Sequence, residues 1–587
     1  MKGFLKIFFA SLLALIAFSL IGIIIVVWMA GNAVSDDKAD VGSNAVLVLD
    51  LSASFPEQTK DNTLNALFDS EAEASIPGLY QAIRLIQHAK SDSAVKGIYI
   101  KASYNNNGSG ANEELRNAIV DFKKSGKFVI AYGEVLTQKA YLVASAADKV
   151  YCHPKGGLDW SGYSTQLIFF KNLLDKLQIQ PEIFYAGKYK SATEPFRVTE
   201  MTSANREQTS VWLGDLYGSF LLHIAEARKL DTASLHRLAS DGAIRTASDA
   251  VNFKLIDAAR YDDEVKAEIF SRLKTKEIEK LNFVSLSKYA KSVNLNKGSF
   301  DTRVALIFAE GDIVDGKGDE GQIGSEPFRN LFRKARFDKN IKAVVLRVNS
   351  PGGSALASDV IWREIMLTRK EKPVVVSMGD VAASGGYYIA CGGDSVFADA
   401  NTITGSIGVF TMMVNMKEFF KNKLGITFDG VATSPYANTG SATRPLTDAE
   451  RRFLQADVDS VYMSFKERVA SGRKRSVTYI DSIAQGRVWT GKRAIEIGLV
   501  DRIGTLQDAI TCAVRMAKIK DYRIKEFPER KSLIDQLMGG GATKSVKAKA
   551  IREEIGEEQF MLFQQMKKVK GWFDIPQARL PFELRVN

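Results

Sequence analysis

The chain has 587 residues, of which 45% are hydrophobic and 25% are charged. Both fractions are typical of globular domains, so the composition excludes a largely disordered chain and a small disulfide-stapled scaffold. The formal net charge is +11, yet acidic residues are interspersed among the 79 Lys and Arg residues, and no basic run is interleaved with aromatic residues. We therefore expect no nucleic-acid partner.

An uncharged, apolar segment of 24 residues, 7–30, follows a short N-terminus that contains Lys2 and Lys6. Its length suffices to cross a hydrocarbon core of about 30 Å as one helix. Acidic residues come after it, so the positive-inside rule leaves residues 1–6 in the cytoplasm and the rest of the chain beyond the membrane. A cleavable signal peptide is the alternative, but its apolar region normally has only about 7–15 residues. We predict a retained, single transmembrane anchor.

The rest of the chain contains one unit twice. At an offset of 246 residues, the segment from Phe128 (FVIAYGEVLTQKAYLVASAADKVYCH) aligns with the segment from Val374 (VVVSMGDVAASGGYYIACGGDSVFAD). The strand-like segments from Val95 and Ile341 align in the same register, and later blocks keep the same order. Chance similarity does not preserve the order of several blocks, so we infer an internal duplication.

Each half alternates strand-like apolar runs with amphipathic helices. This alternation predicts an α/β fold in which helices pack around a mostly parallel sheet. We assign residues 45–270 to the first half and 300–520 to the second, with a connection over 264–298. In the C-terminal tail, 521–587, a helix is expected over 551–570, either solvated or docked on a neighbour or on the membrane surface.

Cysteine spacing indicates neither a zinc site nor a disulfide framework. Cys152, Cys391 and Cys512 lie far apart, and none belongs to a C-x-x-C motif. We predict three core cysteines, no metal and no cofactor.

Two glycine-containing loops of the second half follow strands, at the edge where a parallel sheet usually places its functional groups. The first, residues 349–354 (NSPGGS), has consecutive glycines whose backbone N–H groups suit an oxyanion hole. The second places Ser384 among small residues, and the Gly385 N–H is suited to the other half of such a hole. Either loop alone is consistent with a tight turn, but the pair predicts a serine nucleophile.

A serine hydroxyl needs a base within hydrogen-bond reach. No histidine lies in a glycine-rich or small-residue context, and all four belong to the first half: His88, His153, His223 and His236. A lysine is the alternative, provided that burial lowers its pKa from about 10.4. The loop 185–196 offers Lys188 and Lys190 among small and aromatic residues.

The duplication favours one of these lysines. Where the second half has Ser384 the first half has Gln138, and where the first half has Lys190 the second half has Gly440. Ordinary divergence is the simpler reading, but each half has lost what the other retains. We therefore predict one composite site, built from Ser384 and Lys190.

At this point the sequence resembles peptidase family S49, the signal peptide peptidase A or protease IV family, in its long form. The resemblance covers nearly the whole chain and is carried by the motifs at 350–353 (SPGG), 379–388 (GDVAASGGYY), 404–408 (TGSIG) and 189–196 (YKSATEPF). It implies a ClpP/crotonase-like fold in each half, with Ser384 as nucleophile and Lys190 as general base. By the same resemblance Ser406 hydrogen-bonds the lysine amine, and Gly352 or Gly353 forms the oxyanion hole with Gly385.

The same resemblance implies a homotetramer in the bacterial inner membrane, with a cytoplasmic N-terminus and an extracytoplasmic catalytic body. The implied substrates are signal-peptide remnants and other extended hydrophobic peptides. Two alternatives stay open. One is an acyl-thioester enzyme of the same fold, for which we see no nucleotide-binding feature. The other is a membrane-anchored assembly scaffold, against which the retention of both Ser384 and Lys190 argues.

Overall fold

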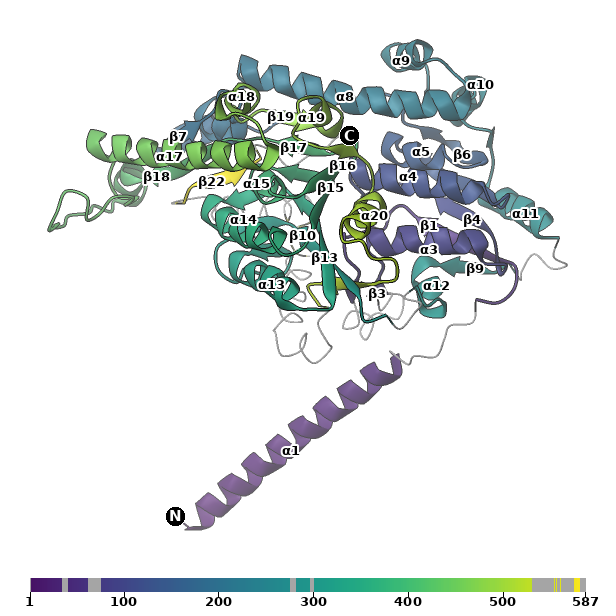
Figure 1. Ribbon diagram of the computed structural model, residues 1–587, viewed down its shortest axis with the longest axis horizontal. Coiled ribbons are helices and arrows are strands. Elements are labelled where there is room, and N and C mark those ends of the chain that lie inside the picture. The colour runs from purple at the N-terminus through teal and green to yellow at the C-terminus, as the bar shows by residue number, and fades with distance from the viewer. Residues whose placement is uncertain are drawn as a thin grey trace.

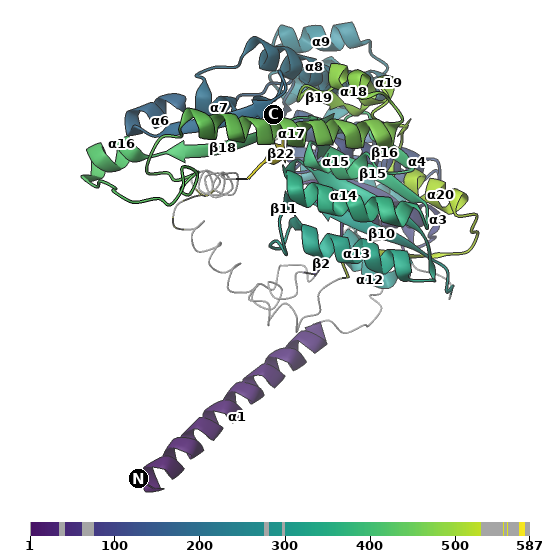
Figure 2. The same ribbon diagram turned by 60° about the vertical axis from the view of Figure 1, so that its left-hand side comes forward.

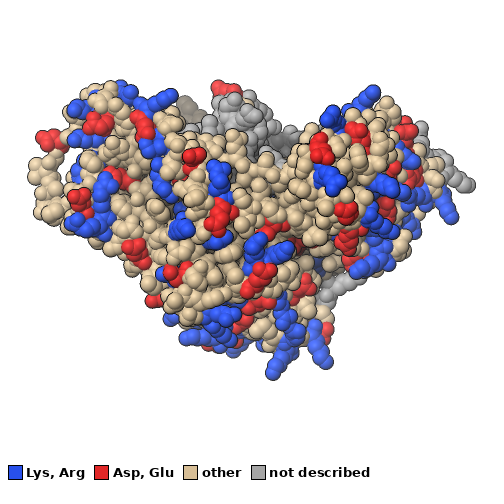
Figure 3. Space-filling view, turned by 90° about the horizontal axis from the view of Figure 1, so that it is seen from above, with Lys and Arg blue, Asp and Glu red and all other residues tan. Residues whose placement is uncertain are grey.

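The computed structural model describes residues 2–33, 41–61, 75–274, 281–295, 300–529 and 575–580, together with 554, 556 and 560. Figure 1 shows two α/β units side by side, the first in purple to blue and the second in teal to green. Lys and Arg are interspersed with Asp and Glu over the face in Figure 3, so this face carries no single-sign surface.

Helix α1 (Lys2–Ala33) contains the predicted anchor, residues 7–30, and lies apart from both units in Figures 1 and 2. Among the residues that the structure describes, no helix meets the length and hydropathy expected of a membrane-spanning helix.

The first half is built on a six-stranded, fully parallel sheet. Its order is β8 (Ala258–Ala259), β6 (Lys149–Leu158), β5 (Phe128–Leu136), β4 (Val95–Lys101), β1 (Ala45–Asp50) and β9 (Phe283–Ser285). Its helices are α3 (Leu79–Ser91), α4 (Ser109–Lys123), α5 (Gln138–Ala144), α6 (Lys171–Leu177), α7 (Glu194–Arg197), α8 (Ser203–Arg228), α9 (Thr232–Ser240), α10 (Ala247–Asn252), α11 (Asp262–Leu273) and α12 (Leu286–Ser292). A short ladder joins β2 (Lys60–Asp61) to β3 (Ser75–Ile76).

The second half repeats this arrangement with an eight-stranded sheet. Its main order is β19 (Val488–Thr490), β17 (Ile403–Gly405), β15 (Val374–Ala383), β13 (Ile341–Ser350), β10 (Arg303–Glu310) and β21 (Arg523–Phe527), with β16 (Ser395–Ala398) and β20 (Arg502–Ile503) branching from β15. Its helices are α13 (Ser325–Phe337), α14 (Ala355–Arg369), α15 (Gly385–Ala390), α16 (Lys417–Phe419), α17 (Asp448–Arg473), α18 (Val477–Ile483), α19 (Gly491–Glu496) and α20 (Leu506–Met516). Only β19 is antiparallel among the strand pairs described in this sheet.

Strand periodicity explains how this second sheet is covered on both faces. Along β10, Ala305 and Ile307 face the core beneath α13 and α14, whereas Val304, Leu306 and Phe308 face the core beneath α20. Successive side chains of a strand point to opposite faces, and both sets are buried because helices cover both faces.

Matching hydrogen bonds confirm the duplication. Tyr141 donates its hydroxyl hydrogen to the Leu255 carbonyl, and the aligned Tyr387 does the same to Leu499 at 2.8 Å. Such buried hydroxyls need a partner, and both halves supply the same one. The predicted α/β fold with a duplicated unit is therefore confirmed.

A third sheet, which the sequence patterns do not predict, joins the two halves. Its order is β12 (Gln322–Gly324), β11 (Asp312–Val314), β14 (Gly352–Ser354), β22 (Gln577–Arg579), β18 (Val409–Asn415) and β7 (Gln180–Ala186). Only β7 comes from the first half, and β22 comes from the C-terminal tail. Figure 2 shows the consequence: the blue α6 and α7 lie beside the green α16 and β18.

The predicted connection, 264–298, and the C-terminal tail, 521–587, both contribute strands that the sequence does not predict. The connection 264–298 supplies most of α11 and all of β9 and α12, and β9 extends the first sheet alongside β1. The tail supplies β21 to the second sheet and β22 to the third. The helix predicted over 551–570 lies almost entirely outside the described residues.

Candidate active site

Strand register places Ser384 beside Ser406. β15 and β17 run parallel with Ala383 opposite Gly405, so the next residue of each strand leaves the sheet at the same point. The Ser384 N–H donates to the Gly405 carbonyl over 2.8 Å and fixes this arrangement. Both serine side chains are fully buried.

Lys190 reaches the same point through the third sheet. β7 and β18 run antiparallel with Ala186 opposite Val409. Lys190 follows β7 by a few residues and Ser406 precedes β18 by a few residues, so antiparallel pairing puts both at the same end of the ladder. The Lys190 Nζ lies 2.8 Å from the Ser384 Oγ and 3.2 Å from both the Oγ and the carbonyl oxygen of Ser406.

Ser384 has an unusual backbone conformation, with φ of 55° and ψ of −114°. It is the single residue between the end of β15 at Ala383 and the start of α15 at Gly385. A non-glycine residue at such angles costs roughly 1–3 kcal/mol and persists only where the surroundings enforce it. The sharp turn projects the Ser384 hydroxyl away from the sheet and toward Lys190.

Burial controls the charge of Lys190. Its side chain is 1% exposed, and burial alone lowers the pKa of the amine well below its ordinary value. Desolvation penalises the ammonium form, whereas a nearby anion would favour it. Its closest hydrogen-bonding partners in the described structure are the two serines, which carry no charge.

The glycine loop of β14 lies next to the Ser384 turn. A Cβ on Gly352 would stand 2.6 Å from the Gly385 nitrogen, so the two glycines approach as no other residue type permits. Gly352 also has φ of 97°, which favours glycine. Its own N–H donates to the Ser350 Oγ at 3.1 Å.

The other residues considered in the sequence analysis do not contact this site. Lys188 is exposed, with its amine over the Tyr189 ring at 5.4 Å. The histidines have partners within the first half: His88 contacts Tyr289, His153 contacts Tyr261, His223 contacts Glu113 and His236 contacts Tyr217. Gln138 donates to the Gly162 carbonyl instead of lining a second site.

Comparison with known proteins assigns the chain to a family. The sequence pattern of peptidase family S49 matches residues 121–276 and again residues 366–520. The chain belongs to peptidase family S49. The first matched segment contains Lys190, and the second contains Ser384 and Ser406.

Relatives cover most of this S49 chain. Protease 4 of Salmonella typhi is 35% identical over 541 residues, which is 89% of this chain and 86% of the relative. Protease 4 of Haemophilus influenzae is 34% identical over 524 residues, 84% of each. The chloroplastic serine protease SPPA of Arabidopsis thaliana is 33% identical over 512 residues, 85% of this chain and 74% of the relative. The predicted family is confirmed, and the chain is a serine peptidase.

Sequence reasoning gave no role to three residues, Gly486, Gly408 and Gln208, that contact the loop around Lys190 in this S49 peptidase. A Cβ on Gly486 would lie 2.6 Å from the backbone nitrogen of Lys190, and a Cβ on Gly408 would lie 3.1 Å from the Lys190 Cδ. Gln208 donates to the Tyr189 carbonyl at 3.0 Å and accepts from the Val488 N–H at 3.1 Å, so it ties the loop to the second half.

Proposed function

We propose that this S49 peptidase uses Ser384 as nucleophile and Lys190 as general base, in one composite site per chain. The observation that carries the proposal is the 2.8 Å contact between the Lys190 Nζ and the Ser384 Oγ in a fully buried setting. A base must lie within hydrogen-bond reach of the proton that it removes.

The contacts of Lys190 match a neutral amine. Such an amine has two N–H donors and one lone pair, and three oxygen atoms surround the Lys190 Nζ. In the neutral form that we propose, the N–H groups donate to the Oγ and the carbonyl oxygen of Ser406, and the lone pair is directed at the Ser384 Oγ, 2.8 Å away. Ser406 thus acts as a positioning residue, because it turns the lone pair toward Ser384.

The reaction then proceeds through an acyl-enzyme. The Ser384 Oγ bonds to the substrate carbonyl carbon while Lys190 takes its proton, and the oxyanion accepts hydrogen bonds from the Gly353 and Gly385 N–H groups. Lys190 returns the proton to the leaving amine as the peptide C–N bond breaks. It next deprotonates the water that hydrolyses the ester and regenerates Ser384.

The substrates we propose are signal-peptide remnants and other extended hydrophobic peptides, in line with the relatives named Protease 4 and SPPA. We also propose that residues 7–30 within α1 anchor the chain in the bacterial inner membrane with the body on the extracytoplasmic side. The apolar side chains of Ile7, Leu13 and Phe18 on this helix are 70–80% exposed and need an apolar surrounding. Each half is proposed to have the ClpP/crotonase-like fold.

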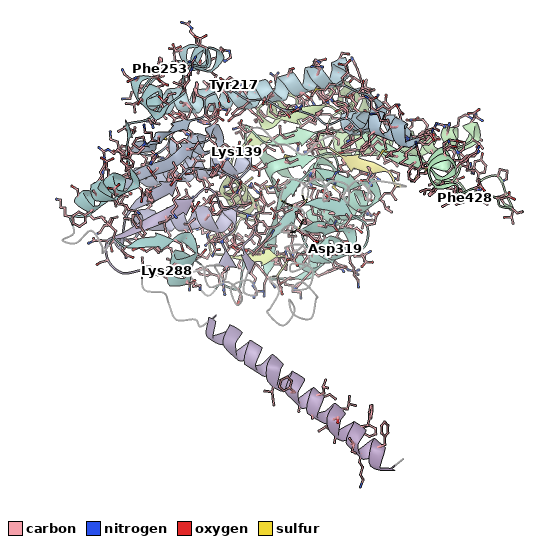
Figure 4. The ribbon with its side chains drawn as sticks, turned by 180° about the vertical axis from the view of Figure 1, so that it is seen from behind. Lys139, Tyr217, Phe253, Lys288, Asp319 and Phe428 are labelled. Atoms are coloured by element: carbon pink, nitrogen blue, oxygen red, sulfur yellow. The ribbon has the colours of Figure 1, made fainter. Side chains whose placement is uncertain are left out.

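A homotetramer is the assembly that we propose. The segment between α16 and α17 presents exposed apolar side chains, with Phe428 51% exposed at the tip seen in Figure 4. Leu424, Ile426 and Tyr436 are exposed in the same segment. A cluster of this kind on a soluble surface marks a contact with another protein.

Covalent labelling of the nucleophile tests the proposal. The purified body, residues 41–587, is treated with a serine-reactive fluorophosphonate and digested, and the modified residue is located by mass spectrometry. We expect one adduct, on Ser384, together with loss of hydrolysis of a fluorogenic apolar peptide. An adduct elsewhere, or full hydrolysis by the labelled protein, contradicts the assignment. A folded body that neither labels nor hydrolyses peptide supports the scaffold alternative.

Peptidase activity should depend on pH through Lys190. Burial lowers the pKa of this amine, and only its neutral form accepts the Ser384 proton. Activity is therefore lost as the pH falls below the pKa of Lys190 in the folded enzyme. We expect log kcat/KM for the apolar peptide to rise with unit slope and then level off, well below pH 10.5. A flat profile between about pH 5 and pH 9 contradicts a lysine base.

A further inference from the structure

We propose that Gln208 of α8 is a positioning residue of the peptidase, whose side-chain amide holds both neighbours of Lys190 and ties them to the strand beside Ser406. The proposal deepens the proposed function and rests on it, because it takes Lys190 as the base. Gln208 acts through Tyr189 and Ser191, the residues directly before and after Lys190.

Helix α8 reaches from the first half onto the second, and Figure 1 shows it along the top of both units. Its later residues Phe220 and Ile224 pack in the core of the first half. Trp212, earlier in the helix, packs with Ile403 and Val488 of the second half. A side chain near the start of α8 is therefore placed to bridge the two halves.

The first turns of α8 bury polar side chains. Asn205 is 0% exposed and Gln208 is 1% exposed, and Thr209 is also buried. Residues three and four apart lie on one face of a helix, so these side chains form a single polar stripe. A buried polar group costs free energy unless it is hydrogen-bonded. The stripe is therefore tolerated only because of the hydrogen bonds that it makes.

The hydrogen bonds of Gln208 determine which way its amide points. Its Nε2 donates to the Tyr189 carbonyl and to the Ser191 Oγ, both at 3.0 Å, and its Oε1 accepts the Val488 N–H at 3.1 Å. A backbone N–H only donates and a backbone carbonyl only accepts, so the reverse orientation would break both backbone contacts. The Asn205 Oδ1 also accepts from Nε2, at 3.3 Å. Both polar atoms of the amide therefore have partners.

The partners of Gln208 lie on the two sides of the site. Two of them are the neighbours of Lys190. The third, Val488 of β19, pairs with Gly405 of β17, the residue directly before Ser406. One amide therefore fixes the loop that carries the base relative to the strand that leads to the serines. A misplacement of about 1 Å at such a site costs about 10²-fold in rate.

The charged groups around the lysine loop have partners or solvent of their own. Glu194 accepts hydrogen bonds from the first residues of α8 and its N-cap. Glu207 pairs with Arg487 at 3.0 Å, and Lys188 is exposed. Burial accounts for the lowered pKa of Lys190. A loosened loop would admit water to the amine and return its pKa toward the ordinary value.

Gln208→Leu and Gln138→Leu test the proposal as a matched pair in the full chain, purified in detergent. Gln138 is also a buried glutamine, 2% exposed, but its amide bonds the Gly162 backbone within the first half. We expect Gln208→Leu to lower kcat for the fluorogenic apolar peptide about 10–100-fold at unchanged KM, and to move the acid limb of the pH profile to higher pH. Gln138→Leu should keep the kcat and pH profile of the parent. Equal kinetics of the two variants overturn the proposal.

Gln208→Glu provides a second test that holds even if Gln208→Leu does not fold. It keeps the shape of the side chain and the acceptor for the Val488 N–H, and removes the donor that binds the neighbours of Lys190. Its carboxylate also favours the ammonium form of Lys190, so the acid limb should again move to higher pH. A limb at the pH of the parent, with the parent kcat, overturns the proposal.

Hydrogen exchange separates this inference from the proposed chemistry. Backbone amides of residues 187–193, followed by mass spectrometry, should exchange faster in Gln208→Leu than in the parent, and at the parent rate in Gln138→Leu. Lys190→Met is assayed alongside. Full activity of Lys190→Met contradicts the proposed function, and this inference with it. An inactive Lys190→Met, together with parent-like exchange or parent-like kcat in Gln208→Leu, overturns this inference alone.

Discussion

Ser384→Ala and Lys190→Met are each expected to lower kcat/KM for the apolar peptide by at least about 10³-fold, because each removes half of a unit that acts together. Ser384→Ala removes the atom that bonds to the carbonyl carbon. Lys190→Met keeps the length and volume of the side chain but removes the amine that contacts the Ser384 Oγ at 2.8 Å. The measurement is hydrolysis of the fluorogenic peptide by the body, residues 41–587, with each variant checked for folding.

The effects of the Ser384 and Lys190 substitutions should not be additive. The double variant should be no slower than the worse single variant, since neither residue accelerates the reaction without the other. Lys188→Met is the matched control, because Lys188 lies in the same loop but is exposed. The Lys188→Met variant should have the activity of the parent. Lys190→Met should melt within about 4 °C of the parent, since it removes a buried amine and not a core side chain. Activity above a tenth of the parent value in Lys190→Met would assign the base elsewhere.

Ser384 and Lys190 could be identified from the sequence because the two halves of the chain can be compared with each other. Ser384 and Lys190 stood out as the positions at which one half keeps a reactive group and the other has Gln138 or Gly440. The strand-loop-helix pattern around Ser384 predicted the place of the turn, although not its backbone angles. The position of Ser406 came from the family resemblance, since a serine in a Thr-Gly-Ser-Ile-Gly segment has no other distinguishing pattern.

The features that sequence reasoning missed depend on contacts between segments far apart in the chain. β7 pairs with β18, and β22 with β14, through backbone hydrogen bonds that leave little trace in side-chain periodicity. A three-residue strand such as β22 is too short for alternation to be recognised. The fit of Gly486 against Lys190 likewise appears only when both loops are in place. Local sequence patterns predict helices and strands well, but they do not predict which strands pair with one another.

The halves are also tied together by a buried charge cluster that no local pattern indicates. Arg347 of β13 is 1% exposed and contacts Glu57 at 2.8 Å and Glu114 at 2.6 Å, both from the first half. It also donates to the Met378 carbonyl in β15 at 3.0 Å. Burial by itself lowers the pKa of the Arg347 guanidinium. The two carboxylates outweigh this effect and raise the pKa above its ordinary value. Burial raises the pKa of Glu57 to about 7 against the opposing effect of Arg347.

Lys139 lies at the same junction between the halves in Figure 4, and burial lowers the pKa of its amine against the effect of the Asp380 carboxylate. Asp380 in turn accepts the Ala111 N–H of α4 at 2.9 Å. Charged groups therefore bridge the junction at several points, and Arg347 is the most deeply buried of the cations there. Removing it should have the largest effect on how firmly the halves are joined.

Arg347→Met is expected to destabilise the body by about 3–5 kcal/mol, because it leaves two carboxylates buried without their cation. For a body of this size, this corresponds to a melting temperature lower by about 3–5 °C in scanning calorimetry. Arg303→Met is the matched control, since Arg303 also lies in the second half but meets Asp338 at 3.9 Å on a partly exposed surface, and it should cost less than about 1 kcal/mol. Equal melting of the two variants contradicts a structural role for the cluster.

The deficit of Arg347→Met should also grow with pH, and this follows from the sign of the proton linkage. Without the cation, burial raises the carboxyl pKa of Glu57 further above that of the unfolded chain, so the folded variant binds more protons than the folded parent. Because the pKa of Glu57 in the parent is already about 7, the stability of Arg347→Met relative to the parent falls as the pH rises above about 7. β13 leads directly into Gly352 and Gly353, and Glu57 and Glu114 belong to the half that supplies Lys190. The kcat of Arg347→Met should therefore fall on warming before the body unfolds. A loss of kcat that coincides with global unfolding at every pH would show that the cluster stabilises the fold without positioning the site.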